Sequence, residues 1–255
     1  MNGYRVLLAK ELRESLAGGR ALIAAAVFML SGISGPVLTH LLPALLAHSS
    51  TSSITIRVGK QTVVDAIDSY LSNMAQLPML ACILLAMNAV AEERARGVCA
   101  LILSRPVSRT AYLLAKLTAY GLVLGGALLL GAIAAFYYIA VLFTDARLGP
   151  YVLVNLGLAS ALLDVLAITL LCSTLLRSGV AAGGVAFVLF IALSTLPGLW
   201  SPLGAWLPTN ITDHAHALLS GAWGARDLVQ PLVGGVLLMI LCIGAACLAL
   251  SRQDV

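Results

Sequence analysis

The chain has 255 residues, of which 60% are hydrophobic and only 10% are charged, and its mean hydropathy is +1.00. Soluble domains usually carry about 25% charged residues, so this composition excludes an ordinary water-soluble domain and indicates a membrane protein. The net charge of +4 is modest, and we expect membrane lipid and no nucleic acid among the partners.

The chain begins with a polar segment, residues 1–20, in which charged and apolar side chains are mixed. Tyr4, Leu8, Leu12 and Leu16 recur at every fourth position, which predicts an apolar stripe along one face of a helix. We expect an amphipathic helix at the membrane interface, with its basic side chains near the lipid headgroups. A simpler interpretation stays open, in which the segment only supplies positive charge that orients the first span.

Six apolar runs follow, each long enough to cross the membrane. Crossing about 30 Å of hydrocarbon takes roughly 20 residues as a helix, and each run must be helical because lipid offers no partner for a free backbone N–H or C=O. The sequence therefore predicts an all-α polytopic membrane protein with six transmembrane helices. The runs are 21–47, 71–91, 112–143, 151–176, 179–199 and 228–250.

The distribution of basic residues orients these spans. Six spans place both termini on one side of the membrane, and that side holds eleven of the fifteen Lys and Arg residues. Because cytoplasmic loops are enriched in Lys and Arg, we expect both termini in the cytoplasm and a prokaryotic inner-membrane location. The eleven residues are Arg5, Lys10, Arg13, Arg20, Arg94, Arg96, Arg105, Arg109, Lys116, Arg177 and Arg252.

Two outer loops are expected, at residues 48–70 and 200–227, so that residues 21–255 form one transmembrane domain after the N-terminal helix. The second loop holds all three tryptophans, a residue type that prefers the membrane boundary. A short apolar stretch in this loop, at 216–223, cannot span the bilayer. We therefore predict a short re-entrant helical segment before the last span.

The main cytoplasmic loop, about residues 92–111, combines a charge cluster with an apolar patch. Gly97 follows the cluster and can end a helix, and Ser108 is positioned to cap the next helix. Residues 101–103 are apolar on a short charged loop, which indicates a protein partner; a plain positive loop is the simpler alternative. The charged residues before Gly97 are Glu92, Glu93, Arg94 and Arg96.

This loop resembles the one after the second span in type-2 ATP-binding-cassette (ABC) exporter permeases. The positions that fit the pattern are Glu92, Glu93, Arg94, Gly97, Ser104, Arg105, Pro106, Val107, Ser108, Arg109 and Lys116, whereas Val98 stands where the family usually has Thr. The segment Lys10-Glu11-Leu12-Arg13 resembles the interfacial helix of the same family. The six-span layout and the re-entrant outer segment agree with it.

The resemblance implies a permease subunit of an exporter in which two permease chains, identical or homologous, pair above two copies of a separate ABC ATPase. The implied coupling residues are Glu92, Glu93, Arg94, Arg96, Gly97, Ser104, Arg105, Pro106, Ser108 and Arg109, and the implied interfacial helix carries Lys10, Glu11 and Arg13. ATP and Mg²⁺ would bind the ATPase, and this chain would need no cofactor. The chain itself is not expected to be an enzyme, because its Gly59-Lys60 pair is followed by Gln61 and does not form a phosphate-binding loop.

Asp164 is the only acidic residue deep inside a predicted span. A charge there is costly and should face protein or water, so we treat Asp164 as a candidate for the translocation path; local satisfaction of the carboxyl is the alternative. The other functions left open are a secondary transporter that uses Asp164 and an intramembrane enzyme. We expect no metal site, because the histidines of Asp213-His214-Ala215-His216 fit a membrane-surface loop better than a metal site. The substrate is not identified by the sequence, although nearly uniformly apolar spans favour a hydrophobic or amphipathic one.

Overall fold

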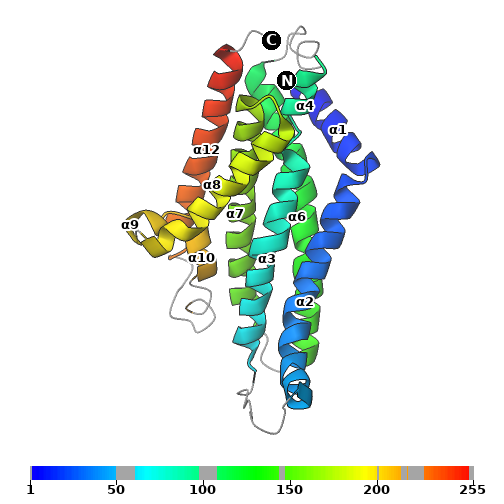
Figure 1. Ribbon diagram of the computed structural model, residues 1–255, viewed down its shortest axis with the longest axis vertical. Coiled ribbons are helices and arrows are strands. Elements are labelled where there is room, and N and C mark those ends of the chain that lie inside the picture. The colour runs from blue at the N-terminus through cyan, green and yellow to red at the C-terminus, as the bar shows by residue number, and fades with distance from the viewer. Residues whose placement is uncertain are drawn as a thin grey trace.

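The computed structural model describes residues 2–49, 61–97, 108–143, 147–199, 201–213, 217 and 227–252. No β-strand occurs among these residues; α2, α3, α6, α7 and α12 run roughly along one axis, α8 crosses it obliquely, and both termini lie at the same end of the bundle (Figure 1). We call this the termini end. The helices are α1 (Asn2–Ala17), α2 (Arg20–Ser49), α3 (Val63–Ala86), α4 (Ala91–Ala95), α6 (Arg109–Leu142), α7 (Leu148–Leu175), α8 (Gly179–Leu199), α9 (Ser201–Gly204), α10 (Thr209–Asp213) and α12 (Val229–Arg252).

Six of the helices, α2, α3, α6, α7, α8 and α12, are long and apolar enough to cross a membrane. This confirms the prediction of an all-α polytopic membrane protein with six spans. Helix α3 begins at Val63, eight residues before the expected start of the second span. The early start has a local cause: Thr62 accepts a hydrogen bond from the Asp65 backbone N–H, while Asp65 accepts one from the Thr62 backbone N–H, which forms a capping box.

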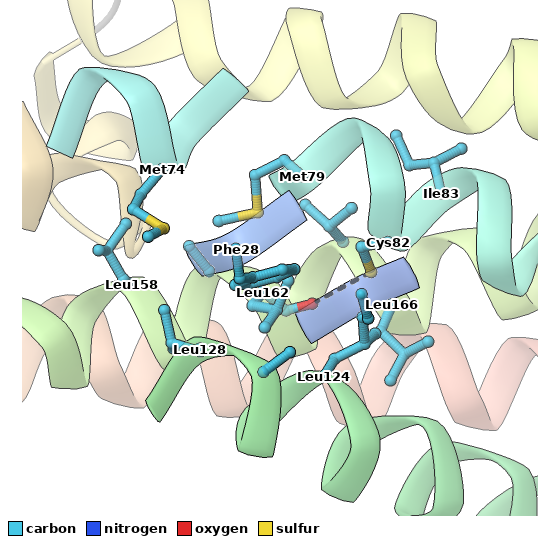
Figure 2. Close-up of a cluster of buried hydrophobic side chains, with 14 of the residues drawn as sticks. Phe28, Met74, Met79, Cys82, Ile83, Leu124, Leu128, Leu158, Leu162 and Leu166 are labelled. Atoms are coloured by element: carbon cyan, nitrogen blue, oxygen red, sulfur yellow. Dashed lines mark hydrogen bonds between the residues drawn. The ribbon is translucent and has the colours of Figure 1, made fainter. Parts of the chain in front are cut away.

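The main apolar core lies where α2, α3, α6 and α7 meet, and Figure 2 shows side chains from these helices interlocking around Phe28, Met79 and Leu162. Helices α2 and α6 approach closely because glycines face each other: a Cβ on Gly32 would lie 2.5 Å from the Gly131 carbonyl oxygen. Small residues at such crossings let membrane helices pack backbone to backbone. This core fixes α6, which continues to the termini end.

Helices α8 and α12 lie at the periphery and leave most of their surface exposed. The segment between them holds α9 and α10, which lie beside the middle of the bundle, short of the far ends of α2 and α3 (Figure 1). It packs against the spans, since a Cβ on Gly157 of α7 would lie 2.5 Å from Ile211 and one on Gly234 of α12 would lie 1.7 Å from the Trp206 carbonyl oxygen. This placement agrees with a re-entrant segment before the last span.

Candidate functional site

Helix α4 begins the candidate coupling loop, and it is anchored on the end of α7. The Ser173 hydroxyl accepts hydrogen bonds from the backbone N–H groups of Val90 (3.1 Å) and Ala91 (3.0 Å), and it donates one to the Met87 carbonyl oxygen (2.8 Å). The Arg94 guanidinium donates to the Thr174 carbonyl oxygen at 2.6 Å. Because Thr174 lies in the last turn of α7, this contact places a cation where the helix dipole favours one.

Four charged side chains join α4 to α1 and α6; Glu11 and Lys116 are buried, and Lys10 and Glu93 are partly exposed. Lys116 of α6 is only 2% exposed, and its Nζ lies 3.0 Å from Glu11 Oε1 and 3.0 Å from Glu93 Oε2. The Lys10 Nζ lies 3.0 Å from Glu93 Oε1 and 3.2 Å from Glu11 Oε1. We call Lys10, Glu11, Glu93 and Lys116 the charged quartet; with all four ionised, it contains two carboxylates and two ammonium groups.

The quartet is held further by the Tyr112 hydroxyl, which donates to Glu93 Oε2 at 2.5 Å. Burial by itself lowers the pKa of Lys10, but the hydrogen bond to Glu93 and the neighbouring Glu11 charge outweigh it, so the pKa of Lys10 is raised. Carboxylates of Glu11, Glu14 and Glu93 come close enough to share a cation. The two lysine ammonium groups already lie among them, so the arrangement is a mutual charge pairing.

Apolar packing surrounds the quartet on the α1 side. Leu7 of α1 packs in a second cluster with Val90, Tyr112, Leu113 and residues of α12. The packed face of α1 is centred on Leu7, Glu11 and Ser15, which are buried, whereas Leu16 is 62% exposed. The helix predicted at residues 1–20 is present as α1, and Tyr4 and Leu8 of the predicted stripe pack at the edge of its buried face. Arg13 lies on the exposed side.

The free end of α4 is charged and exposed. Arg96 pairs with Glu92 at 2.5 Å between Nη2 and Oε1, and the Arg96 side chain is 71% exposed. Gly97 has φ of +70°, so it ends the helix in a left-handed conformation that a side chain rarely adopts. The sequence predicted this glycine as the breaker. Ser104, Arg105 and Pro106, with the expected apolar patch, lie outside the described residues.

The candidate coupling loop ends where α6 begins. Ser108 has an extended backbone conformation and its hydroxyl accepts a hydrogen bond from the Ala111 backbone N–H at 3.2 Å, which confirms it as the N-cap. The Arg109 guanidinium donates to the Leu250 carbonyl oxygen in the last turns of α12. Both ends of the loop are thus tied to transmembrane helices.

Asp164 is remote from this site, near the middle of α7, and is 5% exposed. Its Oδ2 has no hydrogen-bond partner among the described residues. The atom lies beside Gly235 of α12, where an added Cβ would lie 3.0 Å from Oδ2, 2.7 Å from Ser160 Oγ and 2.7 Å from Pro208 Cγ. The carboxyl therefore lies inside one chain, at the contact between α7, α12 and the segment after α9.

The family of the chain follows from sequence comparison. A family model described as ABC-2 family transporter protein matches residues 5–219, a range that includes the quartet, α4 and all spans before α12. The chain belongs to the ABC-2 transporter family. It is also similar to the uncharacterized transmembrane protein YxlG of Bacillus subtilis (strain 168), at 31% identity over 229 residues that cover 87% of each chain. Members of the ABC-2 family are membrane components of transporters that work with an ABC ATPase.

Within this ABC-2 chain, the structure brings together some of the residues that the sequence predicted as site residues. Lys10, Glu11 and Glu93 were each predicted as site residues, and the structure brings them together. Lys116 was read only as part of the family pattern, and Tyr112 and Ser173 were missed. Two signals were available: a lysine on an otherwise apolar helix face needs a carboxylate partner, and Tyr112 lies one turn before Lys116.

Proposed function

We propose that this chain is the permease subunit of an ABC exporter, driven by a separate ATPase that docks on the loop between α3 and α6. The observation that carries the proposal is the charged quartet, since it connects the start of that loop to α1 and to a transmembrane helix. The docking surface begins at the exposed end of α4, with Glu92 and Arg96, and continues into Ser104, Arg105 and Pro106. Arg94, Gly97, Ser108 and Arg109 support it from both ends.

The mechanism requires that force on the loop reaches the spans without being lost in local bending. The charged quartet satisfies this requirement, because displacing Lys116 or Glu11, its two buried members, leaves an unpaired charge away from water. Movement of α4 therefore displaces α1 through Lys10 and Glu11, and α6 through Lys116. The Ser173 and Arg94 contacts pass the same movement to α7.

In the assembled transporter, two permease chains, identical or homologous, pair in the inner membrane, and two ATPase chains bind at the termini end, which lies in the cytoplasm. ATP and Mg²⁺ bind the ATPase chains, and this chain needs no cofactor. ATP-driven closure of the ATPase pair moves the two loops and exposes the substrate path to the outside. The apolar spans favour a hydrophobic or amphipathic substrate, and Asp164 is a candidate for its path.

A co-purification experiment tests the docking surface. The chain is co-expressed with ABC ATPases of the same genome, as wild type and with Glu92→Lys and Arg96→Glu combined. This double exchange reverses both exposed charges but keeps the pairing within α4, so the fold is retained while the docking surface changes. We expect ATPase recovery to fall about tenfold, which corresponds to about 1.4 kcal/mol of binding free energy.

Arg177→Glu is the control, because Arg177 is an exposed cation at the same end of the bundle, between α7 and α8. It should leave recovery of the ATPase unchanged. Equal recovery with the double exchange and with wild type would show that the ATPase binds elsewhere. If the double exchange and Arg177→Glu lowered ATPase recovery equally, the loss would be a general charge effect. That result would also contradict the proposed docking surface.

A further inference from the structure

A groove of about 730 Å³ runs between α6 and α7, in the half of the bundle away from the termini. The two helices are joined by a short connection, yet each has its main packing partners elsewhere, α6 against α2 and α7 against α12. They therefore diverge on the outer surface of the bundle. Ligand pockets in proteins usually measure about 300–1,000 Å³, so this groove has the size of a binding site.

The groove is apolar and opens toward lipid. Its rim is formed by side chains that are half exposed or more, including Leu129, Ile133 and Leu156, and its floor by the buried Leu128 and Ala132. Since α6 and α7 are both transmembrane helices, the medium at the rim is hydrocarbon. A hydrocarbon chain can therefore enter from the membrane without passing through water.

The polar residues in the groove wall are already paired with the protein. The Asn155 side chain accepts from the Tyr70 hydroxyl at 2.6 Å and donates to the Tyr151 carbonyl oxygen at 2.9 Å. The Tyr151 hydroxyl donates to the Ala132 carbonyl oxygen at 2.7 Å. These contacts orient the polar atoms toward neighbouring helices, so the groove favours an occupant that needs no hydrogen bonds there, such as an acyl chain.

Two glycines keep the groove open. A Cβ on Gly125 or Gly126 would meet no atom within 4 Å, in contrast to Gly131 on the same helix, whose Cβ would lie 2.6 Å from the Phe28 carbonyl oxygen. Glycine in a helix interior costs about 0.5–1 kcal/mol relative to alanine. Gly131 offsets that cost by close packing, whereas the space that a side chain on Gly125 or Gly126 would fill is open.

A basic residue adjoins the groove lining at the start of α7. Arg147 is the N-cap of α7, is exposed, and directly precedes Leu148, which lines the groove. It makes no ion pair with any described residue. A guanidinium matches the geometry of a phosphate group with two parallel hydrogen bonds. The groove is thus an apolar trough with an exposed basic residue next to its lining in the chain.

We propose that this groove binds a membrane phospholipid, with one acyl chain between α6 and α7 and its phosphate at Arg147. The site is separate from the proposed ATPase coupling and does not depend on it. A second copy of the chain is a less suitable occupant. Two identical concave surfaces that meet at a two-fold axis leave the hollow unfilled.

Photo-crosslinking tests the site. The full chain is reconstituted in nanodiscs that contain a phosphatidylglycerol with a diazirine in one acyl chain, irradiated, and mapped by mass spectrometry. We expect the label to concentrate on α6 and α7 beside the groove. Gly126→Leu should lower this labelling about tenfold, equivalent to about 1.4 kcal/mol, because leucine fills the hollow. Gly184→Leu on α8 is the matched control, since its Cβ also meets open space, outside the groove, and it should leave the labelling unchanged.

The headgroup contact is tested with a diacylglycerol that carries the same diazirine chain. Wild type should prefer the phospholipid, and Arg147→Gln should remove that preference while labelling by diacylglycerol persists. This variant keeps the test informative if Gly126→Leu aggregates. Even labelling of α6, α7 and α8, equal effects of the two leucine variants, or an unchanged preference in Arg147→Gln would overturn the proposal. The proposal would also be overturned if the groove stayed unlabelled and Gly126→Leu dissociated a dimer of the chain. A second copy of the chain would then occupy the groove.

Discussion

Lys116 shows how the surroundings of one residue determine its role. A lysine on a transmembrane helix is costly unless it is paired, and here the pairing partners, Glu11 and Glu93, come from segments 105 and 23 residues away along the chain. The sequence predicted the two carboxylates as site residues but could not predict this meeting point. It depends on how α1 and α4 pack on α6, which local patterns do not encode.

Removing the Lys116 charge should destabilise the protein strongly. Lys116→Met leaves the buried Glu11 and the partly exposed Glu93 with only Lys10 between them, and breaking the buried Lys116–Glu11 pair costs about 3–5 kcal/mol. Thermal unfolding in detergent should therefore occur several degrees lower, whereas Arg177→Met, which removes an exposed cation, should change it little. The double variant Glu11→Gln with Lys116→Met should lose less unfolding free energy than the two single variants lose in sum. Full additivity of the two losses would show that these side chains do not interact.

Gly235 provides a residue-level test of the contact around Asp164. Gly235→Ala places a methyl group 2.7 Å from Pro208 Cγ and 3.0 Å from Asp164 Oδ2, and overpacking of this kind costs about 1–3 kcal/mol. Gly244→Ala on the same helix meets open space and should be neutral or slightly stabilising. The measurement is the thermal unfolding temperature of each variant. If Gly235→Ala and Gly244→Ala unfold at the same temperature, α12 does not pack on α7 at Gly235.

At the scale of elements, the spans could be predicted well and their ends less well. Apolar length is enough to identify each transmembrane helix, since lipid permits no other backbone conformation there. The start of α3 at Val63 depends instead on a capping box, a polar signal that hydropathy ignores. The orientation of α1 could not be deduced from its apolar spacing, because its packed face includes Glu11, a charge that is buried only through its lysine partners.

The contact that holds α4 on the end of α7 should depend on Ser173. Ser173→Ala removes the acceptor for two backbone N–H groups, and each buried group left unsatisfied costs about 1–3 kcal/mol. Hydrogen exchange of residues 87–97 should accelerate, while exchange in the centre of α6 stays the same. Ser194→Ala, which removes only an exposed hydroxyl bonded within its own helix, should have no such effect. Unchanged exchange in Ser173→Ala would mean that α4 is held by other contacts.

For the whole molecule, composition and charge distribution were sufficient to predict a six-span membrane protein, and the motif around α4 indicated the family. Neither could predict the groove between α6 and α7. In Gly121-x3-Gly125, which has the spacing of a helix-packing motif, a Cβ on Gly121 would lie 3.3 Å from the Leu163 side chain of α7, whereas a Cβ on Gly125 would meet open space. Whether such a motif faces protein or lipid depends on the arrangement of all six helices.

We propose that α1, α4 and the start of α6 move as one body when the ATPase closes. The most direct test places spin labels at Arg13 of α1 and Arg96 of α4, both exposed, and measures their distance by pulsed electron resonance in the complex with its ATPase, with and without trapped ATP. We predict that the distance between these labels within one chain stays constant, while the distance between the two Arg96 labels of paired chains changes. A change or broadening of the distance within one chain on ATP binding would contradict the account.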